Sequence, residues 1–284
     1  MAKQSTIADY GADTSQPTIR QIGVADLFDA LAKGFDDFKA MPTHLIFLIL
    51  IYPIIMLLSG RVAAGYDVLP LVFPLLAGYT LVGPLVAIGM YELSRRREGG
   101  HDISRKHLFD VLKSPSFGAI VRLGIVLVII YFAWLIAALA IFKLTFGGPA
   151  AASMGTFFLE VITLELGNAA PDSIEAFASQ ILTTSAGWKL FVLGSGVGLA
   201  FAIVVLALSV VSFPMLLDRK VSAWTAARTS VRAFVANPAT MIVWGLIVAA
   251  ALVIGTLPLF VGLAIVMPVL GHASWHLYRK VVEH

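Results

Sequence analysis

A long stretch without charge near the C-terminus limits the folds that this chain can adopt. No charged residue occurs from Ala233 to Gly271. A single helix of this length would extend about 58 Å, because each residue adds about 1.5 Å. The hydrocarbon core of a bilayer is only about 30 Å thick. The stretch must therefore fold back on itself, and we expect the turn near Gly255-Thr256-Leu257-Pro258, which predicts a transmembrane hairpin.

The composition extends this interpretation to the whole chain. Of its 284 residues, 59% are hydrophobic and 13% are charged, whereas soluble domains contain about 45–50% apolar and about 25% charged residues. Lipid-facing positions of a membrane protein must also be apolar, so we predict an all-α polytopic membrane bundle. Cysteine is absent, which excludes disulfides and thiolate metal sites. The net charge of +3 is small and gives no reason to expect nucleic-acid binding.

The hydrophobic segments predict one membrane domain over residues 24–284. A polar segment without periodicity, residues 1–23, precedes it and is expected to be a disordered cytoplasmic tail. Amphipathic surface helices are predicted over 24–40, 103–113 and 222–235, and the apolar face of the first is expected to pack on the protein's own bundle. Six transmembrane helices are predicted at about 44–60, 69–93, 117–143, 190–217, 239–256 and 258–278.

The placement of positive charge predicts the orientation of these spans. Of the 20 lysines and arginines, only Arg61, Lys143 and Lys189 fall on the side opposite to the chain termini. Cytoplasmic loops are enriched in lysine and arginine, so both termini are expected to be cytoplasmic. The largest loop on the outer side is residues 147–187. Its acidic residues are candidates for contacts with partners or lipids, namely Glu160, Glu165, Asp172 and Glu175.

One pattern occurs three times along the chain: a surface helix, a proline, a span, a turn, a second span and a basic exit. The surface helix and the first span of each copy meet at a proline, and an apolar residue stands four positions before it. The three prolines are Pro42, Pro115 and Pro238. The sequence therefore predicts three hairpin repeats. Parallel repeats of this kind occur in transporters, and they also arise by duplication of a stable hairpin.

His272 and His276 are the candidate cofactor-binding residues. They are four residues apart and therefore lie on one face of the last helix. Histidines bind metals and haem, and ionisable residues within spans suggest a function. No HExxH motif and no carboxylate at ligand spacing accompanies them. A packing role for the two histidines near the end of the last span is therefore favoured over ligation or proton transfer. No metal site or catalytic residue is predicted.

Glu92 takes the position in the first repeat that His276 takes in the third. It is expected to pair either with His276 or, as favoured, with an arginine one turn further along its own helix. The basic run Arg95-Arg96-Arg97 is a candidate for contacts with partners or anionic lipid headgroups. Ordinary orientation-determining charge explains this run equally well. No phosphate loop, catalytic triad or dinucleotide fingerprint occurs.

Several motifs resemble those of a single family. They are Val211-Ser212-Phe213-Pro214-Met215-Leu216-Leu217-Asp218-Arg219, Ala236-Asn237-Pro238, the ending from Pro268 to Arg279, Gly83-Pro84 and Tyr91-Glu92-Leu93-Ser94-Arg95. The chain resembles a bacterial, largely proteobacterial family of integral membrane proteins catalogued as domain of unknown function 2189. The resemblance covers nearly everything after about Phe35 and implies the bacterial inner membrane. Members are often labelled as a subunit of cytochrome c oxidase.

The chain does not have the features of the catalytic oxidase subunit. That subunit has many more spans and a full set of histidine ligands to haem and copper, whereas this chain has six histidines in total. The favoured hypothesis is a non-catalytic accessory protein that binds partner membrane proteins, such as a respiratory oxidase, through its surface helices and acidic outer loop. One alternative is a small-solute or ion transporter or channel built from the hairpin repeats. The other is a haem- or metal-binding membrane protein, which would use His272 and His276.

Overall fold

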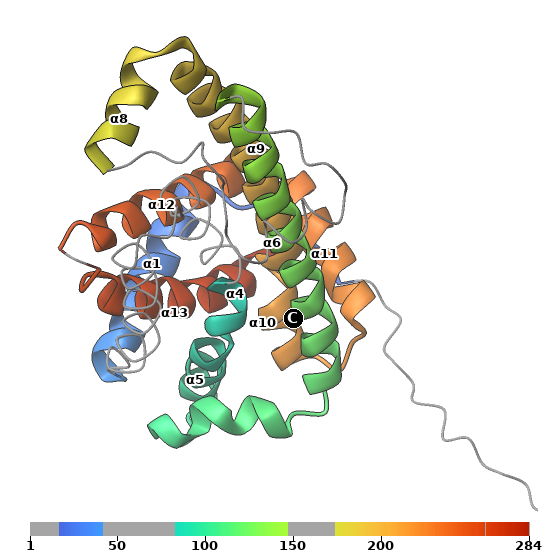
Figure 1. The fold of residues 1–284 in the computed structure, drawn as a ribbon. Helices are drawn as coiled ribbons and strands as arrows, with labels where there is room; N and C mark the ends of the chain where they lie inside the picture. Colours follow the sequence, from blue (N-terminus) through green and yellow to red (C-terminus); the bar gives the residue numbers. More distant parts are fainter. Residues whose placement is uncertain (1–16, 42–82, 147–173, 259, 284) are drawn as a thin grey trace, which may run out of the picture.

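The computed structural model describes residues 17–41, 83–146, 174–258 and 260–283. Within these ranges the regular elements are helical, apart from one isolated bridge between Ile19 and Val282. The predicted all-α class is confirmed. The helices in Figure 1 are α1 (Val24–Ala40), α4 (Gly83–Val86), α5 (Ile88–Glu98), the 3-10 helix η1 (Arg105–Lys113), α6 (Phe117–Phe146), α8 (Ile174–Thr183), α9 (Ser185–Ser209), α10 (Ser212–Asp218), α11 (Ala223–Ala236), α12 (Pro238–Thr256) and α13 (Leu263–Val281).

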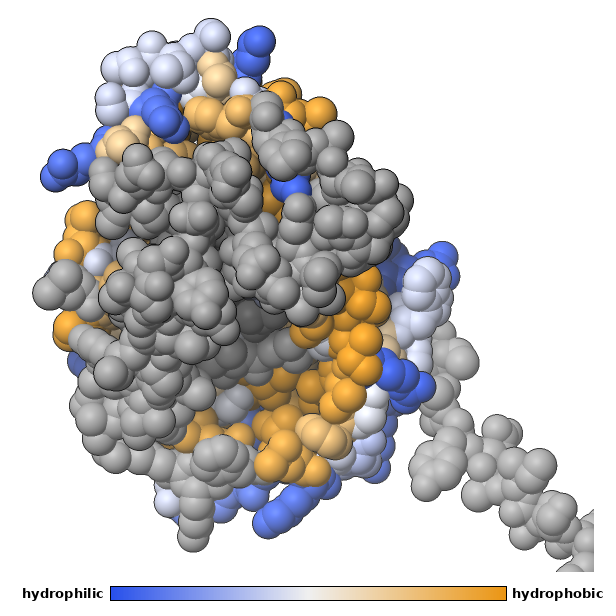
Figure 2. All heavy atoms as spheres, viewed as in Figure 1, coloured by the Kyte–Doolittle hydropathy of each residue, from blue (hydrophilic) through white to orange (hydrophobic). Residues whose placement is uncertain are grey.

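Three helical segments in the described part are long and apolar enough to cross a membrane. They are α6, the continuous stretch Ser185–Asp218 formed by α9 and α10, and α12. These segments correspond to the predicted spans 117–143, 190–217 and 239–256. Figure 2 shows hydrophobic surface along α6, bounded by hydrophilic surface near both of its ends. The described residues therefore support a membrane protein with several apolar helices.

The other predicted spans are not confirmed. Span 44–60 and most of span 69–93 lie outside the described residues, and only α4 and α5 cover the end of the latter. Span 258–278 corresponds to α13, which is not among the three apolar candidates. Its second half contains His272, His276 and two basic residues, and most of α13 is buried by the protein itself. Six spans in three hairpins thus remain a prediction.

The C-terminal hairpin turns where the sequence indicates. Helix α12 ends at Thr256 and α13 begins at Leu263. Two glycines allow the chain to approach itself closely at this turn. A Cβ atom on Gly255 would lie 2.8 Å from Leu263 Cδ2, and one on Gly262 would lie 2.8 Å from the carbonyl oxygen of Gly255. Larger residues at either position would therefore force the two helices apart.

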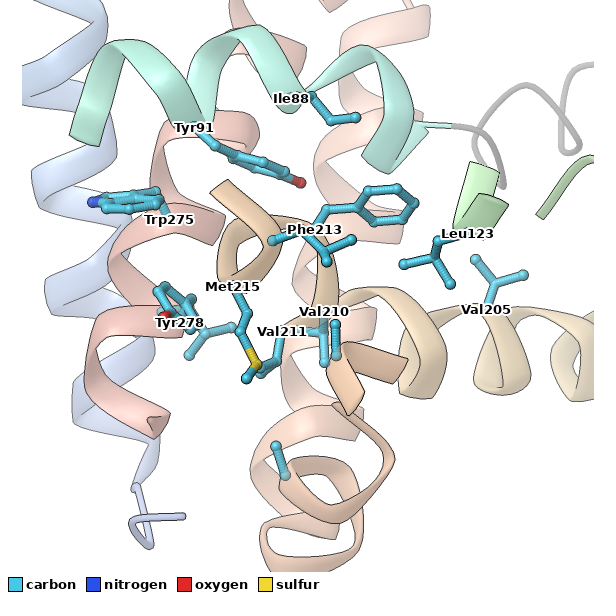
Figure 3. Packing of buried hydrophobic residues seen from close by; sticks show 14 of the residues in the cluster. Ile88, Tyr91, Leu123, Val205, Val210, Val211, Phe213, Met215, Trp275 and Tyr278 are labelled. Atoms are coloured by element: carbon cyan, nitrogen blue, oxygen red, sulfur yellow. The ribbon is translucent and has the colours of Figure 1, made fainter. Parts of the chain in front are cut away.

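Helix α10 lies at the centre of the hydrophobic core. Phe213, Met215 and Leu216 are fully buried, and Figure 3 shows Phe213 between residues of α5 and α6, with Tyr278 of α13 near Met215. The break between α9 and α10 has a local cause, because Pro214 has no N–H to donate to the preceding turn. The Ser212 hydroxyl instead donates to the carbonyl of Leu208 at 2.6 Å.

Helix α1 packs antiparallel along α13. A Cβ atom on Gly34 would lie 2.5 Å from the backbone nitrogen of Ala273, so the two backbones are in close contact. Lys280 pairs with Asp26 at 3.0 Å and with Asp29 at 2.9 Å near the start of α1. The bounds of α1 agree with the predicted helix 24–40.

The segment before α1 also pairs with the end of the chain. The N–H of Arg20 donates to the carbonyl of Val281 at 2.8 Å, and the N–H of Glu283 donates to the carbonyl of Thr18 at 3.0 Å. The predicted disordered tail covered residues 1–23, of which 1–16 lie outside the described residues. The described remainder of that segment is instead bonded to the C-terminal end.

Candidate functional site

A buried polar cluster lies where α1, α5 and α13 meet. We call it the Asp37 cluster, and it consists of Asp37, Ser94, Arg97, His272 and His276. Asp37 is only 4% exposed. Its carboxylate accepts hydrogen bonds from the Ser94 hydroxyl at 2.5 Å, from Arg97 Nη1 at 2.5 Å and from His276 Nε2 at 2.9 Å. The fifth member, His272, has its Nδ1 2.8 Å from Ser94 Oγ.

Helix spacing brings these side chains together. Asp37 continues the buried face of α1 that begins with Leu27, Ala30 and Gly34, because residues three or four apart share a face. The small residues on this face let α13 approach. On the other side of α13, a Cβ atom on Gly271 would lie 2.9 Å from the Met90 side chain of α5. Close packing of both helices on α13 therefore positions the cluster.

The partners of Asp37 keep it ionised. Burial acts to raise the pKa of Asp37, but hydrogen bonds from His276 and Ser94, the charge of His276 and the hydrogen bond from Arg97 outweigh it. The pKa of Asp37 therefore lies below its ordinary value. The guanidinium of Arg97 compensates the negative charge inside the protein.

The ionised carboxylate determines the hydrogen-bond directions in the cluster. An ionised carboxylate can only accept, so Ser94 donates its single proton to Asp37, and Ser94 Oγ accepts from His272 Nδ1–H. In a neutral ring the lone pair then lies on His272 Nε2. This atom is buried and has no hydrogen bond of normal geometry to any described residue, although the backbone of Met90 approaches the ring.

This geometry limits the chemistry of the cluster. The Ser94 proton goes to Asp37 and not to a histidine, so the histidine base of a Ser-His-Asp triad is not in place. Asp37, with its lowered pKa, is a weak base for activating a serine. Both histidines face Asp37, and His276 uses its Nε2 to bind it. His272 Nε2, which is buried without a normal hydrogen bond, is the candidate atom for a contact with a cofactor. Within the described residues, no group of three or more metal-ligating side chains is present.

Glu92 pairs with arginine, as the favoured alternative predicts. Its buried carboxylate accepts two hydrogen bonds from Arg95, each at 2.8 Å, and lies 3.7 Å from Arg96. Arg96 also lies 3.5 Å from Asp110 of η1. His276 is occupied by Asp37, so the alternative pair between Glu92 and His276 does not form in this structure.

A second group of polar contacts joins the ends of α5, α10 and α13. Glu98 accepts from Trp275 Nε1 and from Arg279, both at 2.9 Å. The Tyr278 hydroxyl donates to Asp218 at 2.6 Å. These contacts join charged residues at the C-terminal ends of the three helices. Much of the positive charge that was used to predict orientation therefore also has partners within the protein.

The remaining predicted site residues lie elsewhere. Glu175 is exposed at the start of α8, whereas Glu160, Glu165 and Asp172 lie outside the described residues. Sequence reasoning did not identify Asp37 or Ser94 as site residues. The signal was the small residues Ala30 and Gly34 at helical spacing before Asp37.

Comparison with known proteins gives one match. A family model described as "Predicted integral membrane protein (DUF2189)" matches residues 72–165 and 156–218, which together are more than half of the chain. No curated protein and no solved structure matches it. The matched region includes α5 and α10 and ends before α13. It therefore supports the membrane assignment and does not bear on the role of His272 and His276.

Proposed function

The chain belongs to the DUF2189 family of predicted integral membrane proteins, and from this premise we propose that it is a non-catalytic protein that binds a partner membrane protein. The proposal is carried by one observation, an exposed apolar stripe on α1. Its members, Val24, Phe28 and Phe35, are exposed, and Phe28 is 61% exposed. We had expected the apolar face of this helix to pack on the protein itself. Part of that face does so, because Leu27 is buried and Leu31 packs against the core, whereas the stripe itself stays exposed.

The charge of α1 favours a protein partner over a lipid surface. The helix carries four aspartates and two lysines, and Lys33 and Lys39 pair with Asp29 at 2.9 Å and Asp36 at 2.8 Å. Anionic membrane surfaces attract basic and not acidic segments. Aromatic side chains are enriched in protein–protein interfaces. We therefore expect a partner with an apolar groove and a basic rim.

The Asp37 cluster supports this function by fixing the orientation of α1. Asp37 binds α5 through Ser94 and Arg97 and binds α13 through His276. The helix therefore cannot rotate to bury its stripe without breaking these bonds. A surface held in its binding orientation costs less conformational entropy when a partner binds. We propose that the cluster acts structurally, as an anchor for the stripe.

Photo-crosslinking in native membranes tests the proposal. A photoreactive amino acid at position 28 is compared with one at position 253 of α12, because Phe28 and Val253 are both 61% exposed. We expect a discrete protein adduct from position 28 and lipid adducts from position 253. The adduct should be lost on Phe35→Asp. Lipid adducts alone at both positions would show that α1 faces the bilayer and would refute the proposal.

The identity of the partner is a separate question that the same adduct answers. The labelling of family members suggests a respiratory oxidase, and mass spectrometry of the adduct would identify or exclude its subunits. An adduct with an unrelated membrane protein would support the partner-binding proposal and exclude the oxidase as the partner.

The haem-binding alternative rests on His272 Nε2, which is buried without a normal hydrogen bond. A visible absorption spectrum of the protein purified in mild detergent tests it. A haem band that disappears on His272→Ala would support this alternative. A spectrum without any such band, from protein expressed with sufficient haem, would remove it.

A further inference from the structure

Helix α11 is held to the protein by a face of small and hydroxyl side chains. Ala226, Thr229, Ser230 and Ala233 are buried, and Ser230 Oγ accepts a hydrogen bond from the N–H of Val211 at 3.2 Å. The helix follows the end of the segment Ser185–Asp218 and precedes α12, which are two candidate membrane spans. Because it connects these spans, α11 lies at the boundary of the apolar region.

The opposite face of α11 presents apolar side chains outward. Trp224 is 76% exposed, and Val231 and Val235 are also exposed. Positions 224, 231 and 235 are separated by seven and four residues, so these side chains form one stripe along the helix. The hydrogen bond to Val211 fixes the other face inward, and the stripe therefore cannot turn into the core.

The charged residues of α11 and of the segment just before it, from Arg219 onward, are all positive. No acidic residue occurs from Arg219 to Val282. The exposed Arg228 lies on the same side as the stripe, one turn after Trp224. Lys220, just before the helix, is also exposed. The stripe on α1 differs in this respect, because α1 has an excess of aspartate.

We infer that α11 and the preceding basic residues form a binding site for anionic phospholipid headgroups. Tryptophan is enriched at the membrane–water interface. A basic helix with an aromatic apolar face binds in the plane of that interface. Arginine binds phosphate through two parallel hydrogen bonds. Arg228 contacts the lipid phosphate, while Trp224, Val231 and Val235 insert among the upper parts of the acyl chains.

Quenching of Trp224 fluorescence by brominated lipid tests this site in the full-length protein. The protein is placed in nanodiscs of phosphatidylcholine that contain equal fractions of either brominated phosphatidylglycerol or brominated phosphatidylcholine. Subtracting the signal of a Trp224→Phe variant isolates Trp224. We expect stronger quenching by phosphatidylglycerol. Arg228→Gln should lower the relative affinity for this lipid about fivefold, as expected for one basic residue at a membrane surface. Arg228→Lys should give an intermediate affinity, because it keeps the charge and loses the two parallel hydrogen bonds.

Two controls make the result specific. Lys189→Gln, which removes an exposed cation at the other end of α9, should leave the Trp224 signal unchanged. Circular dichroism and the elution volume should match the wild type for every variant. Equal quenching by the two lipids would overturn the proposal, because it would mean apolar contact without headgroup recognition. Absence of quenching by either lipid would also overturn it, because the stripe would then be covered by protein.

Discussion

At the scale of residues, Asp36 and Asp37 show how strongly position determines the role of a carboxylate. Asp36 is exposed and pairs with Lys39 on the same helix at 2.8 Å. Asp37 is buried and has partners from two other helices. A buried charge is unfavourable unless it is paired and hydrogen-bonded. The bonds of Asp37 therefore have to form together, and the removal of one partner leaves the others unsatisfied.

We expect Asp37→Asn to destabilise the protein by about 3 kcal/mol, as found when one partner of a buried ion pair is removed. Asp36→Asn is the matched control and should cost less than about 1 kcal/mol, since exposed pairs contribute little. Reversible unfolding in mixed detergent measures both. Similar losses for the two variants would show that the cluster contributes no more than a surface ion pair.

The pKa of Asp37 predicts how stability depends on pH. Its folded-state pKa lies below the ordinary value of about 3.9. The stabilising contribution is therefore complete above the ordinary pKa and is lost as pH falls below about 4 and through the folded-state pKa. His276, His272, Ser94 and Arg97 face the carboxylate. Thermal unfolding at a series of pH values should show a steeper acid loss for the wild type than for Asp37→Asn, and parallel curves would contradict this assignment.

At the scale of elements, the contact between α1 and α13 depends on Gly34. Alanine has a higher helix propensity than glycine by about 1 kcal/mol, but a Cβ atom here would lie 2.5 Å from the backbone of α13. Backbone atoms cannot move aside as a flexible side chain can. The steric cost therefore exceeds the gain in propensity.

We expect Gly34→Ala to destabilise the protein by about 1–3 kcal/mol, the range for overpacking. Gly196→Ala in α9 is the control, since no described atom lies within 4 Å of a Cβ atom at that position. The control should be neutral or slightly stabilising. Unfolding of both variants under the same conditions gives the comparison, and a neutral Gly34→Ala would mean that the two helices are further apart than described.

Local signals made several elements predictable from the sequence. The predicted and observed bounds of α1 agree, and α11 was predicted one residue too early, at 222–235 instead of Ala223–Ala236. Prolines and polar caps near the helix ends carry this information. The pair between Glu92 and Arg95 could also be predicted from the sequence, because residues three or four apart in a helix are neighbours.

Long-range packing was not predictable in the same way. Which face of α1 is buried depends on α13, which is more than 200 residues away in the chain. The predicted apolar face is buried only along the edge with Leu27 and Leu31, while Val24, Phe28 and Phe35 stay exposed, and hydrophobicity alone does not distinguish the two edges. The polar character of His272 and His276 likewise did not reveal that their partner was Asp37. Only the joint packing of α1, α5 and α13 determines the cluster.

At the scale of the whole molecule, Asn237 connects the N-terminal segment to the C-terminal hairpin. Its Oδ1 accepts from the N–H of Ile22 at 2.8 Å, and its Nδ2 donates to the carbonyl of Arg20 at 3.0 Å. Thr240 also donates to the carbonyl of Ile22 at 2.9 Å. The start of the chain is therefore held by two residues at the beginning of α12.

We expect Asn237→Ala to cost about 2–3 kcal/mol, because two partly buried backbone groups lose their partners and each typically contributes about 1–1.5 kcal/mol. Asn237→Asp keeps an acceptor for Ile22 and loses the donor to Arg20, so its cost should be smaller. Hydrogen exchange at the Ile22 amide reports the change directly. Unaltered protection of this amide in Asn237→Ala would contradict the assigned bond.

The pairing of residues 18–20 with residues 281–283 also has a consequence for the order of events during synthesis. The first of these segments leaves the ribosome early, whereas its partner is translated about 263 residues later. Asp37 likewise meets His276 only after a further 239 residues have been made. Until α13 has been made, the face of α1 that packs against it stays uncovered. The docking of α1 therefore has to follow the synthesis of α13, and a chain that stops before α13 would retain an unburied first helix.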